Sequence, residues 1–567
     1  MSQPLIVSIG SSTNKGVKPV NQDFLGSIIP KEPLLSRKGI VLAMADGISS
    51  SKVSQVASET AISGFLSDYY CTSDSWSVKN SAQKVIKSIN SWLYAQTRNS
   101  PYRFDKDKGY VSTFSALVLK SNTAHLFHSG DTRIYRVSGK NLEQLTEDHR
   151  RVVSADVSYL TRALGIDQTF DIDYQNQLLE QGDVYIIATD GVYEFLKGDK
   201  IAHTIANSDT LTIAADSIIE QALASGSNDN LSIQIVRVDN VPQYQLDEVH
   251  QLTMLPLPPS LSPRMQFDGY EILREIYISS RSHVFLARDN DTQQTVVIKV
   301  PSTELRNDKQ YLEHFMLEEW IAKRINNANV AKAVISNRKR NYLYLVTEYI
   351  EGISLNQWMI DNPKPKLEQV RTIIEQIAKG LQGFHRQEMI HQDLRPANIM
   401  IDSTNTVKII DFGSTFIAGV TDPETEEAMR GTIRYSAPEY FLGQPGTQSS
   451  DLYSLAVITY QMLSGKFPYS AKIAQANSVS AQKKLTYRSI IDDESELPAW
   501  IDDTLEHALH MNPLKRYPVL TEFLNDLRQP NKLFLAKTKP PLIQRDPVMF
   551  WQSISVILFI LLIIKTV

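Results

Sequence analysis

The chain has 567 residues, of which 42% are hydrophobic and 21% are charged, and its formal net charge is −5. This composition is ordinary for a soluble globular protein, so it excludes a wholly disordered chain and a membrane protein of many helices. The net negative charge argues against nucleic acid as a partner, because a phosphate-binding surface usually needs an excess of Lys and Arg. The single cysteine, Cys71, cannot form an internal disulfide bond, which fits a reducing cytosol.

Proline-rich and apolar segments divide the chain. Prolines crowd residues 241–267 and recur among basic residues at 530–546, so we expect both segments to be linkers. Residues 547–564 carry no charge and are long enough for a membrane-spanning helix behind a basic linker. We therefore expect soluble domains at 1–240 and 268–529 and a tail anchor that holds both on the cytoplasmic side. The alternative is a terminal helix that is buried or docks on a partner.

Aspartates stand at the ends of several strand-like segments in the first domain. Apolar runs lead into Asp46-Gly47 and into Asp190, while Asp229 and Asp23 each come just before another such run. Aspartates at strand ends can gather at one rim of a sheet, where their oxygens suit Mg²⁺ or Mn²⁺. A single Asp-Gly pair is more often a turn than a metal ligand, so the prediction depends on the whole set.

In their order along the chain, these motifs resemble those of PP2C-family serine/threonine phosphatases over nearly all of residues 5–238. The matching stretches include NQD at 21–23, ADG at 45–47, HSGDTRIYR at 128–136 and GDVYIIATDG at 182–191. The resemblance implies an α/β/β/α sandwich that hydrolyses phosphoserine and phosphothreonine with water activated by two divalent ions. It also implies that the ligands of two or three Mg²⁺ or Mn²⁺ ions are Asp23, Asp46, the Gly47 carbonyl, Asp131, Asp190 and Asp229.

The first domain departs from the family pattern at two places. Lys18 stands where the family usually has an arginine that grips the substrate phosphate. Lysine supplies the positive charge without the bidentate fork, so we expect Lys18 to bind the phosphate more weakly. Residues 49–51 are serines where glycines commonly follow the ADG motif, which affects a loop near the expected metal site.

The second domain carries a longer signature. A VVIK motif ends at Lys299, the sequence HQDLRPAN spans 391–398, and Asp411-Phe-Gly and Ala-Pro-Glu439 follow. In this order and spacing they resemble the motifs of Hanks-type serine/threonine protein kinases across residues 268–529. The resemblance implies a bilobal kinase fold that binds ATP with Mg²⁺. The whole chain is then a multidomain α+β protein with a C-terminal transmembrane helix.

The kinase resemblance assigns roles to individual residues. Lys299 would bind the α- and β-phosphates of ATP and would itself be held by Glu318 of the regulatory helix. Asp393 would accept the proton of the substrate hydroxyl, while Asn398 and Asp411 would hold Mg²⁺. Arg395 would reach the γ-phosphate, and the backbone of Glu348 and Ile350 would contact adenine. Three further residues are expected to support the fold. Glu439 is expected to pair with Arg516, and Asp451 is expected to brace the catalytic loop.

The nucleotide-binding loop differs most from the family. Tyr277, Ser279 and Ser282 replace the three glycines that let backbone amides approach the phosphates. We therefore expect weak binding of ATP. Gln392 replaces an arginine that usually docks a phosphate on the activation segment, so phosphorylation at Thr421, Thr425 or Thr432 is not expected to be the on-switch.

Together these features predict a bifunctional, tail-anchored signalling enzyme at a bacterial inner membrane. It would phosphorylate protein Ser and Thr residues with ATP and hydrolyse phosphoserine and phosphothreonine. The alternative is an active phosphatase regulated by a pseudokinase that binds a nucleotide or a partner. A third interpretation, an inactive scaffold, is disfavoured because both sets of metal-binding residues are present.

Overall fold

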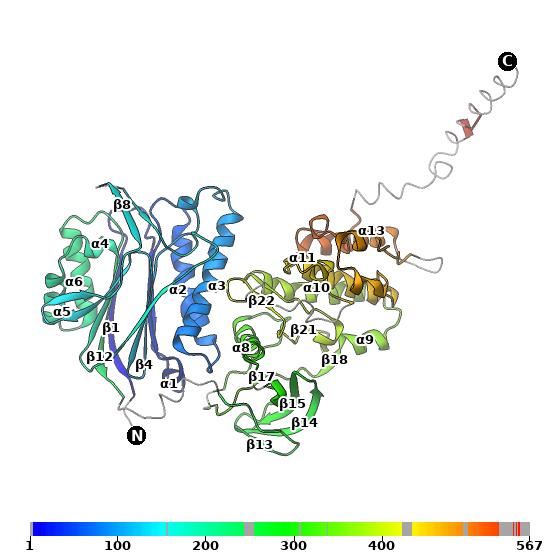
Figure 1. Ribbon diagram of the computed structural model, residues 1–567, viewed down its shortest axis with the longest axis horizontal. Coiled ribbons are helices and arrows are strands. Elements are labelled where there is room, and N and C mark those ends of the chain that lie inside the picture. The colour runs from blue at the N-terminus through cyan, green and yellow to red at the C-terminus, as the bar shows by residue number, and fades with distance from the viewer. Residues whose placement is uncertain are drawn as a thin grey trace.

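The computed structural model describes two domains that lie side by side (Figure 1). It describes residues 4–154, 157–242, 255–305, 308–336, 338, 340–421, 434–491 and 497–531, and a few positions from 548 to 555. Most of the predicted segments 530–546 and 547–564 lies outside the described residues, as do Thr425 and Thr432. No helix within the described ranges is both long and apolar enough to cross a membrane.

The first domain is built on two five-stranded antiparallel sheets packed face to face. Strand β3 (Ile40–Asp46) is buried along nearly its whole length, because one face meets the other sheet and the other face meets helices. In spatial order, one sheet consists of β1 (Ile6–Asn14), β12 (Leu231–Asn240), β11 (Val184–Ala188), β6 (Arg133–Ser138) and β7 (Asn141–Gln144). The other consists of β10 (Asp173–Leu178), β5 (Thr123–Ser129), β4 (Phe114–Lys120), β3 (Ile40–Asp46) and β2 (Asp23–Ile28).

Helices cover both outer faces of this sandwich (Figure 1). The long helix α3 begins where the Ser77 hydroxyl accepts a hydrogen bond from the Asn80 amide, which caps its first turn. Helices α2 (Ser54–Cys71) and α3 (Val78–Arg98) cover the β2–β5 sheet. The other sheet is covered by α4 (Asp190–Tyr193), α5 (Gly198–Asn207) and α6 (Leu211–Ala224). The remaining elements are α1 (Leu34–Lys38) and the hairpin β8 (Arg150–Ser154) and β9 (Val157–Leu160).

The second domain has two lobes. The smaller lobe is an antiparallel sheet with one long helix, α8, which is capped by the Asp308 carboxylate at the Tyr311 amide. Its elements are β13 (Gln266–Phe267), β14 (Tyr270–Ile278), β15 (Ser282–Asp289), β16 (Thr295–Pro301), α8 (Lys309–Arg324) and β17 (Leu345–Glu348).

The larger lobe is mostly helical, with two small sheets next to the smaller lobe. Its helix α11 is buried over most of its length because other helices pack around it. The helices are α9 (Leu355–Asp361), α10 (Leu367–His385), α11 (Gln448–Ser464), α12 (Val479–Gln482), α13 (Ala499–Ala508) and α14 (Leu520–Arg528). The short strands are β18 (Gly352–Ser354), β19 (Met389–Ile390), β20 (Ile399–Asp402), β21 (Val407–Ile409) and β22 (Phe416–Ile417).

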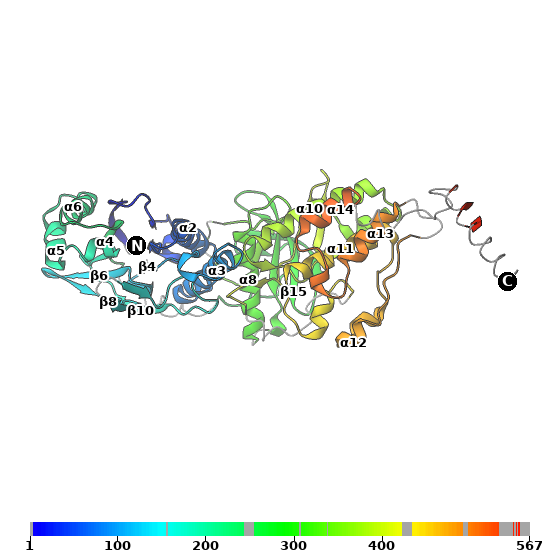
Figure 2. The ribbon, with the colours of Figure 1, turned by 90° about the horizontal axis from the view of Figure 1, so that it is seen from above.

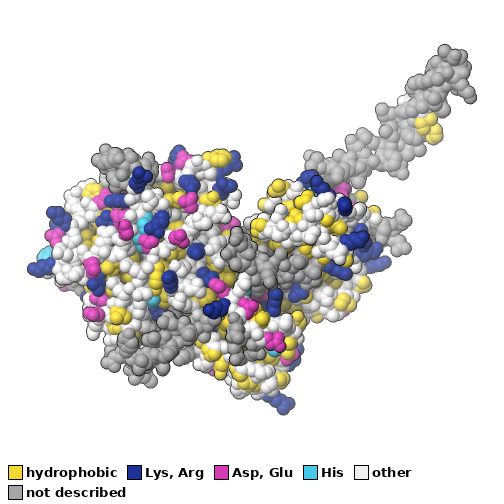
Figure 3. Space-filling model, viewed as in Figure 1, with side chains coloured by type: hydrophobic (Ala, Val, Ile, Leu, Met, Phe, Trp, Pro, Cys, Tyr) yellow, Lys and Arg dark blue, Asp and Glu magenta, His cyan; other side chains and the backbone are white. Residues whose placement is uncertain are grey.

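This arrangement agrees with the predicted mixed α+β architecture, a sandwich followed by a bilobal domain. Seen from above, the helices α2 and α3 of the first domain face α8 of the second (Figure 2). On the face drawn in Figure 3, basic and acidic side chains are interspersed over the first domain.

Candidate active sites

In the first domain, aspartates from both sheets meet at one edge of the sandwich. Asp23 begins β2 and lies directly opposite Asp46, the last residue of β3. Asp190 begins α4 directly after β11, and Asp229 comes just before β12, so both belong to the other sheet. The Thr189 hydroxyl donates a hydrogen bond to Asp23 Oδ2 at 3.0 Å and thereby links the two sheets at this edge.

The electrostatics of this edge favour bound cations. Burial raises the pKa of Asp23 to about 6, and it raises the pKa of Asp46 and Asp190 well above the ordinary value. Repulsion from neighbouring aspartates adds to each of these increases. The Oδ1 atoms of Asp23 and Asp190 are buried and have no hydrogen-bond partner among the described residues. An all-oxygen set of buried carboxylates fits hard divalent ions such as Mg²⁺ and Mn²⁺.

The remaining predicted ligands lie around the same edge. Gly47 follows Asp46, and a Cβ there would come within 2.6 Å of the Ser54 carbonyl oxygen, so only glycine fits. Burial raises the pKa of Asp131 to about 6, and its carbonyl accepts a hydrogen bond from Tyr193 at 2.9 Å. Within the part of the chain that the structure describes, no group of three or more His, Cys, Asp or Glu side chains has the arrangement of a metal site. The metal ligands therefore stay a prediction.

The two departures from the family pattern contact each other. Lys18 Nζ lies 3.3 Å from Asp229 Oδ2 and donates a hydrogen bond to Ser49 Oγ at 3.4 Å. The Ser51 hydroxyl donates to the carbonyl oxygens of residues 108 and 109 and accepts from the Val53 amide. Hydrogen bonds thus hold the loop of serines at 49–51 in place. Lys18, which contacts this loop at Ser49, also lies beside Asp229, an expected metal ligand.

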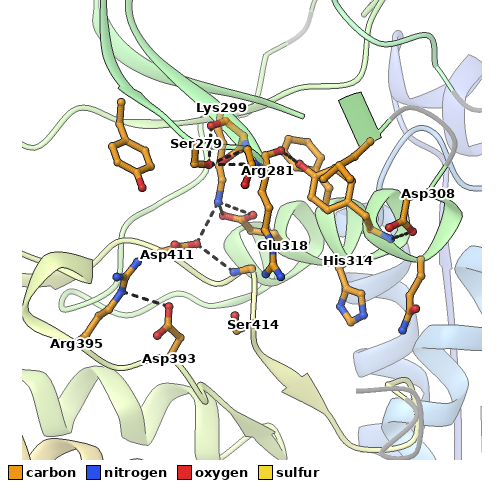
Figure 4. Close-up of a pocket in the computed structure, with 18 residues that line it drawn as sticks. Ser279, Arg281, Lys299, Asp308, His314, Glu318, Asp393, Arg395, Asp411 and Ser414 are labelled. Atoms are coloured by element: carbon orange, nitrogen blue, oxygen red, sulfur yellow. Dashed lines mark hydrogen bonds and ion pairs between the residues drawn. The ribbon is translucent and has the colours of Figure 1, made fainter. Parts of the chain in front are cut away.

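In the second domain, three charged residues meet in a cavity of about 510 Å³ between the lobes (Figure 4). Lys299 Nζ on β16 lies 2.7 Å from Glu318 Oε1 on α8 and 3.1 Å from Asp411 Oδ1. Burial alone would lower the pKa of Lys299, but the two carboxylates outweigh it and raise this pKa. For Asp411, Lys299 likewise outweighs burial, so its pKa falls. This lysine therefore stays charged and the Asp411 carboxylate stays ionised.

Asp393 and Arg395 of the expected catalytic loop face the same cavity (Figure 4). Asp393 accepts a hydrogen bond from Asn398 Nδ2 at 3.1 Å, and Arg395 Nε lies 3.4 Å from its carboxylate. Asp451 on α11 braces the loop, because its carboxylate accepts the backbone amides of residues 391 and 392 and pairs with His385 at 2.8 Å. The bracing role predicted for Asp451 is confirmed.

The cavity lining includes Lys299, Glu318, Asp393, Arg395 and Asp411. Two other groups of predicted contact residues do not line it: Asn398, and the hinge residues Glu348 and Ile350. Asn398 is connected to the cavity by its hydrogen bond to Asp393. At the expected hinge, the Glu348 carboxylate binds Lys408 Nζ at 2.7 Å, and Ile350 is buried. Both side chains are engaged within the domain, and the Glu348 amide donates to the Lys332 carbonyl at 3.0 Å, so the contact of this segment with adenine stays a prediction.

The tip of the nucleotide loop, residues 279–282, is closed by one serine. The Ser279 hydroxyl accepts the amides of Arg281 at 3.3 Å and of Ser282 at 3.0 Å, and it donates to the Ser282 carbonyl at 3.0 Å. On α8, the Tyr311 hydroxyl donates to the Arg281 carbonyl. Two amides that a glycine loop would offer to phosphates, those of Arg281 and Ser282, are thus already bonded within the chain.

The sequence analysis missed this role of Ser279. A signal was present, because Ser279 begins a tight turn between two strands. Serine hydroxyls at such positions commonly accept hydrogen bonds from backbone amides two or three residues further along the chain. The lost glycines indicated weaker binding of ATP but did not show that the Ser279 hydroxyl binds the loop's own amides. Tyr311 was also missed, because nothing in its sequence context points toward the loop.

Comparison with known proteins gives matches to each domain. Residues 16–225 match the family model of protein phosphatase 2C, and residues 270–526 match that of the protein kinase domain. Serine/threonine-protein kinase PrkC of Bacillus subtilis is 26% identical over 268 residues, covering 46% of this chain and 40% of that protein. Serine/threonine-protein kinase PknA of Mycobacterium tuberculosis is 30% identical over 256 residues, covering 44% of this chain and 58% of that protein. The chain therefore matches less than two thirds of either kinase.

Solved structures resemble the first part of the chain. The serine/threonine phosphatase of S. agalactiae has 23% sequence identity and a TM-score of 0.37, and the match covers 41% of this chain and 100% of that one. The phosphatase Stp1 from Staphylococcus aureus has 19% identity and a TM-score of 0.37, with 42% and 98% covered.

Proposed function

Because the chain carries a protein phosphatase 2C domain followed by a protein kinase domain, we propose that it is a bifunctional signalling enzyme. It phosphorylates Ser and Thr residues of proteins with ATP, and it hydrolyses phosphoserine and phosphothreonine. The observation that carries the kinase half is the contact of Lys299 with both Glu318 and Asp411. A charged lysine in this cavity can neutralise phosphate charge during transfer.

In the kinase half, each residue has a chemical task. Lys299 binds the α- and β-phosphates, and Asp411 and Asn398 hold the Mg²⁺ that enters with ATP. Asp393 takes the proton from the attacking hydroxyl, and Asn398 and Arg395 orient its carboxylate. The backbone groups of Glu348 and Ile350 contact adenine.

In the phosphatase half, two or three Mg²⁺ or Mn²⁺ ions would be held by carboxylates and one backbone carbonyl. These groups are Asp23, Asp46, Asp131, Asp190, Asp229 and the Gly47 carbonyl. Such ions activate water for attack on phosphorus. Lys18 binds the substrate phosphate, supported by its place beside Asp229 and Ser49. The buried, unpartnered carboxylate oxygens support the assignment.

The first test uses the full chain with Asp190→Asn. This change removes a ligand charge, so hydrolysis of a phosphothreonine peptide with Mn²⁺ should fall by roughly a hundredfold or more. Incubation with labelled ATP should then show self-phosphorylation that accumulates. Full phosphatase activity of the variant, or of the wild-type chain in EDTA, would contradict the metal assignment.

The second test adds Asp411→Asn or Asp393→Asn to the Asp190→Asn chain. Both additions should abolish phosphate transfer, because they remove the Mg²⁺ ligand and the proton acceptor respectively. The alternative is that the second domain is a pseudokinase, which the closed tip at Ser279 favours. Binding of ATP without any transfer in the Asp190→Asn chain would establish that alternative.

We also propose that residues 547–564 tether the enzyme to a membrane, with both domains on the cytoplasmic side. The support is the uncharged sequence behind a basic linker. A chain that ends at Gln544 should lose membrane association and keep both activities. Recovery of the full-length chain in the soluble fraction without detergent would contradict the tether.

A further inference from the structure

Helix α8 of the kinase domain contacts the nucleotide cavity with one face and the phosphatase domain with another. Glu318 points into the nucleotide cavity and binds Lys299 (Figure 4). Glu313, Trp320 and Arg324 follow at helical spacing on another face, and all three contact the phosphatase domain. The position of α8 therefore affects the kinase site and the contact between the domains together.

The contacts on this outer face are specific. Arg324 Nε lies 2.7 Å from Asp68 Oδ2 of α2, and its guanidinium also donates to Ser88 Oγ of α3 at 3.0 Å. Both charged side chains of the Arg324–Asp68 pair are nearly buried, at 11% and 12% exposure. The Trp76 and Trp320 rings meet edge to face with centroids 6.1 Å apart. This geometry is the favourable one for aromatic pairs.

Two further polar contacts extend this surface. Lys84 Nζ on α3 lies 2.6 Å from Glu313 Oε1 at the beginning of α8. The Ser73 hydroxyl, between α2 and α3, donates to Glu319 Oε2 at 3.0 Å. The phosphatase domain thus contacts α8 from Glu313 to Arg324, the last residue of the helix.

Helix α3 also contacts the larger kinase lobe. Trp92 Nε1 on α3 donates to the Arg386 carbonyl at 3.1 Å. Gly419 has a φ of 76°, and a Cβ there would lie 2.6 Å from the Lys87 carbonyl oxygen of α3. Both lobes therefore contact α3, while α2 contacts the smaller lobe through α8.

We propose that the outer face of α8 is a docking surface for helices α2 and α3 of the phosphatase domain, and that this docking positions Glu318 against Lys299. Moving α8 away from Lys299 would separate the Arg324–Asp68 pair and the Trp76–Trp320 pair. Removing one partner of a nearly buried ion pair leaves an uncompensated charge, which is strongly unfavourable. The phosphatase domain thus holds the kinase domain in its lysine–glutamate-paired state, a coupling that goes beyond the two proposed activities.

The test is a charge-reversal cycle in the full chain, with Asp190→Asn in every protein so that phosphate is not removed. Asp68→Arg and Arg324→Asp are made singly and together. Each single change places like charges opposite each other and should weaken ATP binding and phosphate transfer by about 5- to 150-fold, the usual range of coupling between sites. The double variant should recover most of the loss. Lys379→Asp, which breaks an exposed pair on α10, is the matched control and should change neither quantity.

Hydrogen exchange of the α8 amides provides a readout that does not need catalysis. Each single reversal should accelerate exchange over residues 309–324, and the double reversal should restore protection. If none of the proteins transfers phosphate, the kinase activity proposed above fails, and the exchange data alone decide the docking proposal. Unchanged exchange in the single variants, or no recovery in the double variant, would overturn it.

A second cycle guards against a variant that does not fold. Lys84→Glu and Glu313→Lys reverse a pair in which Glu313 is 47% exposed and Lys84 13%, so Glu313→Lys is the single change that should disturb folding least. The same pattern of loss and recovery is expected, with smaller amplitude because solvent screens the pair. Accelerated exchange over α8 with full phosphate transfer would also overturn the proposal, since docking would then have no effect on the kinase site.

Discussion

At the scale of single residues, the Ser279 hydroxyl decides how the nucleotide loop meets phosphate. It bonds the amides of Arg281 and Ser282, so phosphate has to displace it before these amides are available. The sequence predicted weak ATP binding from the missing glycines. The structure adds a specific cause, since the competitor for the amides is a side chain of the loop itself.

Ser279→Ala should therefore tighten ATP binding. The change removes a competing hydrogen bond whose net value is about 0.5 to 1.5 kcal/mol, so the Kd for ATP should fall about 2- to 12-fold. Isothermal calorimetry on the full chain measures this. Ser280→Ala is the control, because Ser280 lies in the same turn and lines the same cavity but takes no part in the bonds above. Weaker binding by Ser279→Ala would show that the closed turn assists phosphate.

A second residue-scale prediction concerns Lys38, which is almost fully buried in the phosphatase domain. It donates to Thr72 Oγ1 at 2.8 Å and to the Ser73 carbonyl at 2.7 Å, and burial lowers its pKa from 10.5 to about 7. Between these values the unfolded chain binds more protons than the folded chain. This residue's contribution to the free energy of unfolding therefore rises with pH across that window, by up to about 1.4 kcal/mol per pH unit.

The comparison with Lys38→Met makes this measurable. The methionine variant lacks the titration, so the Tm of the wild type minus that of the variant should increase from pH 7 to pH 9. Differential scanning fluorimetry at matched ionic strength gives the difference. A flat profile would mean that Lys38 keeps its ordinary pKa in the folded chain.

At the scale of elements, buried ion pairs connect segments that are distant in the sequence. Arg516 Nη2 lies 2.7 Å from Glu439 Oε2, and both side chains are almost completely buried, at 0% and 2% exposure. This confirms the predicted pairing. It joins the segment after the activation loop to the end of the domain, so the larger lobe depends on it.

Glu439→Gln should destabilise the larger lobe by about 3 to 5 kcal/mol, because it leaves the Arg516 charge buried without its partner. Urea unfolding followed by intrinsic fluorescence measures the loss. Glu375→Gln, which breaks exposed pairs with Lys379 and Arg528, should cost less than about 1 kcal/mol. Equal effects of the two changes would contradict a special role for the buried pair.

The sequence predicted the two domains and the contact of Lys299 with Glu318, and it failed where contact partners come from another domain. Spacing placed Lys299, Glu318 and Asp411 in known positions of a recognised fold, so their meeting was expected. Nothing in the spacing of Trp76 or Trp320 distinguished an interdomain contact from an ordinary core residue. Amphipathic periodicity shows that a helix face is buried and does not show what covers it.

At the scale of the whole molecule, docking and nucleotide binding are linked reciprocally. If α2 and α3 stabilise the state that binds ATP, then ATP must stabilise the docking by the same free energy. Addition of ATP with Mg²⁺ to the Asp190→Asn chain should therefore slow hydrogen exchange in α2 and α3. Exchange in α6, on the opposite side of the sandwich, is the internal control and should not change. Slower exchange everywhere would indicate general stabilisation without a specific link.

One continuous cluster of buried apolar side chains runs through both domains, with Phe65 and Ile89 on one side and Trp320 and Phe384 on the other. A gene fusion of two independent enzymes would need no such shared interior. In this chain, replacing one domain with the corresponding domain of another protein would leave apolar side chains unmatched where the two domains meet. Natural relatives with both halves are therefore expected to inherit them as a unit, and substitutions at positions 68 and 324 are expected to accompany each other.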